Sequence, residues 1–167
     1  MPTGIAGGLL FILTHGLSKA GLFLCAGIIE HNTHRRDIRD LGGLVKSMPV
    51  TAVVFLFCIL STIGIPPFGG FFSKFMVVAG TVKSGQAGVA ALALFVAVLT
   101  VFYLFRLFHA VFLGEPKSAA AGEGSKLMLW VVAILAVLSL ASGLLVKYPM
   151  QLVNIAVRQI TGGILCP

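Results

Sequence analysis

Charged residues are scarce in this sequence. Only 10% of its 167 residues are Asp, Glu, Lys or Arg, whereas 58% are hydrophobic. A soluble domain carries about a quarter charged residues, and the apolar runs here are too long for the core of a globular protein. The composition therefore excludes an ordinary soluble domain and indicates that lipid surrounds much of the chain.

Acidic residues are absent from the apolar runs. All five lie in polar stretches or at the ends of apolar runs, namely Glu30, Asp37, Asp40, Glu115 and Glu123. A charge buried in a membrane usually needs a partner, yet a lysine within an apolar run has no carboxylate nearby in this sequence. We expect its partner to be water or an acid on another chain, which is a first indication that the protein works in a complex.

Residue patterns for metals, cofactors and covalent catalysis are also missing. The three cysteines, Cys25, Cys58 and Cys166, form no CxxC or Cys/His ligand spacing, so a zinc site, an iron–sulfur cluster or a disulfide framework is unsupported. No nucleotide-binding loop or nucleophile triad occurs. We expect no cofactor and no catalytic site in this chain. An alternative is a haem bound by His15 and His109 on facing helices, which the absence of a Soret band would exclude.

The formal net charge is +7, which raises the question of nucleic-acid binding. The basic residues are scattered over loops and apolar segments and are not gathered on one polar face. Membrane topology explains them more simply, because Lys and Arg accumulate in loops on the cytoplasmic side. We therefore expect the bilayer, and no nucleic acid, as the surrounding partner.

Hydropathy predicts an all-α integral membrane protein with about five transmembrane helices. A bilayer core needs about 20 helical residues, and helices are expected near residues 5–29, 49–64, 67–83, 89–113 and 127–146, all in a single membrane domain, residues 1–167. One is short or broken at Pro66-Pro67, because proline removes a backbone donor. Apolar residues at helical spacing predict an amphipathic interfacial helix at about 150–161. The chain is expected to be multi-pass in the cytoplasmic (or inner) membrane.

Two ionisable residues lie deep in the first predicted span. Lys19 is about ten residues from the far end of this span, and a lysine near a membrane centre costs about 2.5–3.5 kcal/mol on insertion scales. His15 lies four residues earlier on the same helical face. Burial makes a lysine release its proton more readily, and histidine titrates near neutrality. The pair is therefore a candidate proton relay. The alternative is a lysine that is tied to a carbonyl for structure alone.

Further ionisable residues lie in or beside other apolar segments. Lys74 follows the Pro-Pro/Gly-Gly break, where freed backbone groups and a charge can share a water-lined cavity. Arg106 stays charged at any relevant pH, so it suits a fixed electrostatic role. His109 is either a relay residue or an interfacial one. His31 and His34, just after the first span, are further candidates for a relay or electrostatic role.

Three motifs resemble those of a known family. The segment from Thr14 to Leu24 is similar to an HxxxK(A/G)xLF helix. The segment from Arg36 to Leu44 is similar to an RDIxxLGGL loop. The segment from Gly64 to Lys74 is similar to a G(I/L)PP..GF(F/I)SK segment. These motifs, in this order, resemble the antiporter-like proton-translocating subunits of respiratory complex I, energy-converting membrane-bound hydrogenases and Mrp cation/proton antiporters. Beyond residue 115 the resemblance is one of hydropathy only.

The resemblance implies roles for individual residues. Lys19 matches the family's central relay lysine, His15 the adjacent histidine, and Lys74 the lysine of a late broken helix near the exit of a half-channel. Many members carry an acid after that lysine, where this chain has Phe75, so the coupling or the choice of ion is expected to differ.

The resemblance covers only the C-terminal part of such a subunit. It implies that other membrane subunits supply the entrance half-channel and the partner carboxylate, and that peripheral redox subunits complete an oxidoreductase complex such as a membrane-bound hydrogenase or an NADH dehydrogenase-like complex. The alternatives are a subunit of a standalone Mrp-type Na+/H+ antiporter and a structural membrane scaffold.

Overall fold

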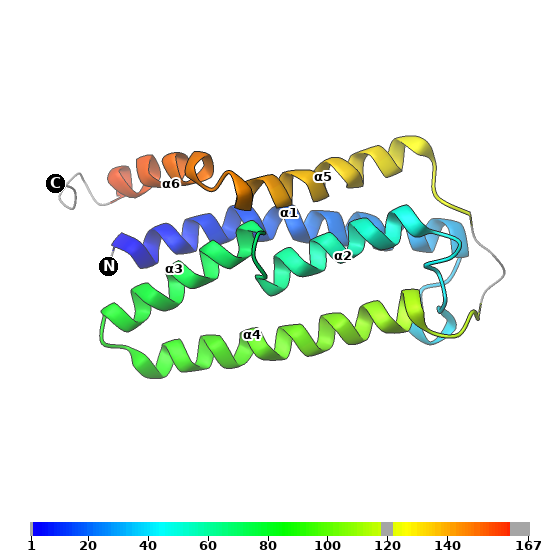
Figure 1. Ribbon diagram of the computed structural model, residues 1–167, viewed down its shortest axis with the longest axis horizontal. Coiled ribbons are helices and arrows are strands. Elements are labelled where there is room, and N and C mark those ends of the chain that lie inside the picture. Colours follow the sequence, from blue (N-terminus) through cyan, green and yellow to red (C-terminus); the bar gives the residue numbers. More distant parts are fainter. Residues whose placement is uncertain (1, 118–121, 161–167) are drawn as a thin grey trace.

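The computed structural model describes residues 2–117 and 122–160, and regular structure in these residues is entirely helical (Figure 1). This confirms the predicted all-α membrane fold. Three helical stretches are long and apolar enough to cross a membrane, near residues 3–33, 87–113 and 126–144, and a shorter apolar helix covers Pro49–Ile63. Cys166, and residue 161 at the end of the predicted interfacial helix, lie outside the described residues.

The first helix, α1 (Pro2–Thr33), is the central element of the bundle. Its 32 residues span about 48 Å at 1.5 Å per residue. It packs against α2, α3, α5 and α6 along its length. The α-helices α2, α3, α5 and α6 are therefore arranged around α1, and α1 carries two of the predicted relay residues.

The next two helices lie end to end beside α1. Figure 1 shows α2 (Pro49–Ile63) running along one half of α1 and α3 (Gly69–Lys83) along the other half. Gly64 ends α2 in the left-handed conformation, with φ 89°, and its N–H bonds to the Leu60 carbonyl at 3.0 Å. The segments expected at 49–64 and 67–83 thus form one path that is broken at the Pro-Pro sequence.

The outer helix, α4 (Ala87–Phe108), packs against α2 and α3 and continues into a π-helical segment, η2 (His109–Leu113). The loop after α1 contains a short 3-10 helix, η1 (Ile38–Asp40). Later in this loop, the N–H of Val45 bonds to the Phe112 carbonyl at 3.1 Å. The loop that follows α1 is therefore hydrogen-bonded to η2, the continuation of α4.

The last two helices, α5 (Lys126–Leu144) and α6 (Lys147–Ile160), follow one another along another side of α1 (Figure 1). The apolar face of α6 packs Val153 and Val157 against Ala6 and Leu10 of α1. The amphipathic character predicted for the C-terminal helix is therefore confirmed. Its position at the membrane interface stays a prediction.

Small residues on α1 let it approach both halves of the broken helix. Gly4 faces Gly80, and Gly7 faces Met76 and Val77, all on α3, whereas Gly21 faces Cys58 on α2. Small side chains permit close helix approach within membranes, where packing drives association. The result is a seam along α1 that brings its middle, with His15 and Lys19, to the level of the break.

Candidate functional site

Lys74 is held at the break by backbone carbonyls. From the second turn of α3 its side chain reaches back to α2, where Nζ donates to the Thr62 carbonyl at 2.8 Å and to the Ile63 carbonyl at 3.0 Å. The last carbonyls of a helix lack partners within the helix and carry partial negative charge. The end of α2 therefore stabilises the Lys74 ammonium without a carboxylate.

His15 presents an unused nitrogen near this lysine. Its ring stacks on Phe11 of the preceding turn, with 4.9 Å between the ring centroids. Its Nδ1 is buried and has no hydrogen-bond partner among the described residues. Buried polar atoms without a partner are rare in proteins, so this nitrogen is a candidate to bind a buried water molecule.

His15 and Lys74 line the same groove, which has a volume of about 740 Å³. Its walls come from α1, the end of α2, α3 and α4, and most of its lining is apolar. The other polar side chains in the lining are Thr62, Thr100 and Tyr103. Because His15 and Lys74 both line it, the groove is a continuous space between the imidazole and the ammonium. Its volume is large enough to hold water molecules.

Lys19 lies one turn beyond His15 on α1 and is half-buried. In the part of the chain that the structure describes, Lys19 makes no hydrogen bond or ion pair. The structure thus brings His15 and Lys74 into one groove and places Lys19 beside them with its amine unpaired.

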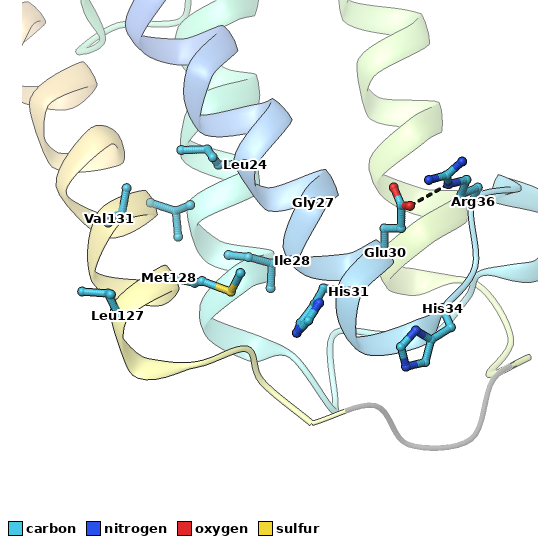
Figure 2. Close-up of a pocket in the computed structure, with 11 residues that line it drawn as sticks. Leu24, Gly27, Ile28, Glu30, His31, His34, Arg36, Leu127, Met128 and Val131 are labelled. Atoms are coloured by element: carbon cyan, nitrogen blue, oxygen red, sulfur yellow. Dashed lines mark hydrogen bonds and ion pairs between the residues drawn. The ribbon is translucent and has the colours of Figure 1, made fainter.

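The remaining predicted residues lie outside this groove. Arg106 and His109 are exposed on α4 and η2. His31 and His34 lie at the end of α1, where they line a second groove of about 760 Å³ between α1 and α5 (Figure 2). Arg36 at its edge donates from Nε to Glu30 at 2.6 Å. Across the described residues, no three His, Cys, Asp or Glu side chains gather as metal ligands.

Sequence reasoning missed the wall that α4 contributes to the groove, and of the stripe of small residues on α1 it found only the polar members Thr14 and Ser18. Thr100 and Tyr103 of α4 line the groove, and only the tertiary packing of α4 reveals this. Small and hydroxyl residues also recur on α1 at positions 4, 7, 14, 18 and 21. Their spacing of three, seven, four and three residues matches one helical face, a signal that hydropathy does not detect.

Comparison with known families and curated proteins agrees with these features. Residues 2–102 match the family described as NADH:quinone oxidoreductase/Mrp antiporter, transmembrane. NADH-quinone oxidoreductase subunit L of Mycobacterium tuberculosis is 40% identical over 151 residues, which are 85% of this chain and 24% of that protein. A Na+/H+ antiporter subunit of Alkalihalophilus pseudofirmus is 35% identical over 156 residues, or 90% of this chain and 32% of that protein.

Solved structures show the same helical arrangement. The Mrp complex of a Dietzia species matches 95% of this chain and 38% of its own, with a TM-score of 0.87 and 28% identity. Respiratory complex I of Thermus thermophilus matches 95% of this chain and 34% of its own, with a TM-score of 0.83 and 28% identity. The chain therefore spans between a quarter and two fifths of the length of these relatives.

Proposed function

Because the chain belongs to the NADH:quinone oxidoreductase/Mrp antiporter membrane family, we propose that it carries protons through part of an exit half-channel. In this proposal Lys19, His15 and Lys74 form the relay. The observation that carries the proposal is the shared groove, in which His15 and the carbonyl-bound Lys74 face one connected space at the break between α2 and α3.

The proposed route follows the geometry of the groove. A proton on Lys19 passes to His15, one turn away, and from there through water in the groove to Lys74. The Thr62 and Ile63 carbonyls stabilise the protonated Lys74, and movement of Nζ away from them releases the proton. No bond chemistry occurs in this chain, so the driving force is electrostatic.

Other subunits complete the proposed proton pathway. Lys19 has no carboxylate partner among the described residues, and a buried charge without a partner is costly. Another membrane subunit, or a further part of the same subunit, supplies that carboxylate and the entrance half-channel. Peripheral redox subunits then change the field on Lys19 and drive the transfer. In this proposal the complex lies in the cytoplasmic or inner membrane.

A second candidate is a subunit of an Mrp-type Na+/H+ antiporter. The 35% identity to a Na+/H+ antiporter subunit and the TM-score of 0.87 to an Mrp complex favour it. The two candidates differ in their energy source. An antiporter moves protons in response to an imposed Na+ gradient without a redox substrate, whereas a redox-driven complex purifies with iron–sulfur or nickel proteins.

The proposal is tested by proton uptake into vesicles that contain the intact complex, with Lys74→Met compared with the wild type. Lys83→Met, at the exposed end of α3, is the matched control. We expect Lys74→Met to lose most of the uptake, and Lys83→Met to keep it. Uptake by Lys74→Met at the rate of the wild type would show that Lys74 is structural.

A further inference from the structure

Five hydroxyl side chains are buried where α1 crosses the break. Each has no more than 1% of its surface exposed, and together we call them the hydroxyl cluster: Thr14, Ser18, Ser61, Ser73 and Ser139. They come from α1, α2, α3 and α5. Buried hydroxyls are costly unless they are hydrogen-bonded, so their partners identify what the cluster holds together.

The cluster joins α1 to both halves of the broken helix. Ser18 Oγ donates to Ser61 Oγ on α2 at 2.7 Å and lies 3.1 Å from Ser139 Oγ on α5. Thr14 Oγ1 lies 3.3 Å from Ser73 Oγ on α3. These side-chain contacts across helices fix how α2, α3 and α5 sit against one short stretch of α1.

Each α1 or α3 member of the cluster directly precedes a proposed relay residue. Thr14 precedes His15, Ser18 precedes Lys19, and Ser73 precedes Lys74. Consecutive residues on a helix point about 100° apart, because a turn contains 3.6 residues. When Thr14 of α1 and Ser73 of α3 face one another, the next side chain on each helix, His15 or Lys74, is turned by one step toward the groove that both line.

Hydrogen bonds fix the rotation of α1 about its own axis more precisely than apolar packing does. Apolar side chains of similar size fill the same volume at several small rotations, whereas a hydroxyl pair needs both distance and direction. A rotation of α1 that separates Thr14 from Ser73 also separates Ser18 from Ser61. Thr14, Ser18 and Ser73 can each still hydrogen-bond to a carbonyl of their own helix. Ser61 would lose the only partner that its hydroxyl has among the described residues, and leaving a buried group unsatisfied costs about 1–3 kcal/mol.

We propose that the hydroxyl cluster consists of positioning residues, which set the rotation of α1 against the broken helix and so keep His15 and Lys19 aligned with Lys74. The inference rests on the proposed relay. It assigns the cluster no proton transfer of its own.

The test compares variants that remove a hydroxyl with variants that keep it. Thr14→Val preserves the side-chain shape and loses the hydroxyl, whereas Thr14→Ser keeps the hydroxyl. Ser18→Ala is compared with Ser84→Ala. Ser84 directly follows α3, and its hydroxyl donates to the Gly80 carbonyl of that helix. Initial proton uptake into vesicles with the intact complex is measured across pH and divided by the amount of assembled complex.

We expect Thr14→Val and Ser18→Ala to lower the rate on the order of tenfold, because small misplacements of reacting groups are costly. Their pH profiles should differ from that of the wild type, because a rotation of α1 changes the distances between Lys74 and the ionisable groups around it. The groups concerned are His15 and Lys19 of α1 and Tyr103 of α4. The neighbouring α2 and α5 carry only Cys58 and Lys126 as titratable side chains. Thr14→Ser and Ser84→Ala should match the wild type.

Two results overturn the inference. One is a pH profile in Thr14→Val and Ser18→Ala that matches the wild type, at a full or reduced rate, because loss of stability alone does not move the profile. The other is an equal effect of Thr14→Ser and Thr14→Val. If either variant fails to assemble, Ser61→Ala provides the same readout. Lys74→Met, measured in parallel, separates the two claims, since uptake by that variant at the wild-type rate contradicts the relay itself.

Discussion

Lys74 illustrates how a membrane protein holds a charge without an opposite charge. Its ammonium is bound by two carbonyls of a helix end, and a break in the helix makes those carbonyls available. The same break requires Gly64, whose φ of 89° lies in a region that other residues rarely adopt. The turn that frees the carbonyls that bind Lys74 is therefore the same turn that requires glycine at position 64.

Gly64→Ala should disturb both the turn and the lysine. A Cβ at this position would lie 3.1 Å from Lys74 Cδ and 3.3 Å from the Gly70 carbonyl oxygen, and a left-handed residue with a Cβ costs about 1–2 kcal/mol. We expect a lower melting temperature of the intact complex and reduced proton uptake. Gly85→Ala, also at positive φ but with open space around it, should lower the melting temperature and leave uptake per complex unchanged. Equal loss of uptake in both variants would contradict this account.

Four residues predicted for a relay or electrostatic role should matter less than Lys74. Their side chains are exposed and outside the groove that contains Lys74: His31, His34, Arg106 and His109. Replacing each of them by Gln should reduce proton uptake less than Lys74→Met does, in the same vesicle assay. A loss equal to that of Lys74→Met in any one of them would place that residue on the main route.

At the scale of elements, the broken helix and its seam with α1 determine the site. The break was predictable, because two prolines and nearby glycines cannot continue a helix. The end-to-end arrangement of α2 and α3 was not, since hydropathy treats each apolar run separately. The seam depends on small residues, and a small residue permits close helix packing only where another helix faces it. Gly7 faces α3 and Gly8 faces open space, a difference that the sequence does not show.

Gly7 and Gly8 provide a matched test of the seam. A Cβ on Gly7 would lie 2.7 Å from the Val77 nitrogen and 2.8 Å from Met76 Cβ, whereas one on Gly8 has nothing within 4 Å. Because overpacking costs about 1–3 kcal/mol, Gly7→Ala should lower the melting temperature of the complex. Gly8→Ala should leave it unchanged or raise it. The seam would be refuted if the two variants melted alike.

At the scale of the whole molecule, we propose that the chain works as one part of a larger assembly. It spans 24% and 32% of two curated relatives, and the amine of Lys19 has no partner among the described residues. The sequence predicted this need for a partner from the absence of acids in its apolar runs. It did not predict which residues of α4 line the groove, because that depends on how α4 packs against α2 and α3.

The central claim is that Lys19 carries protons and does not merely support the fold. The most direct measurement is proton pumping by the intact complex in vesicles with Lys19→Ala, compared with Lys46→Ala in the exposed loop after α1. The account predicts that Lys19→Ala loses most of the pumping while the complex stays assembled, and that Lys46→Ala pumps normally. Pumping by Lys19→Ala at the wild-type rate would contradict the account and leave the chain as a structural membrane scaffold.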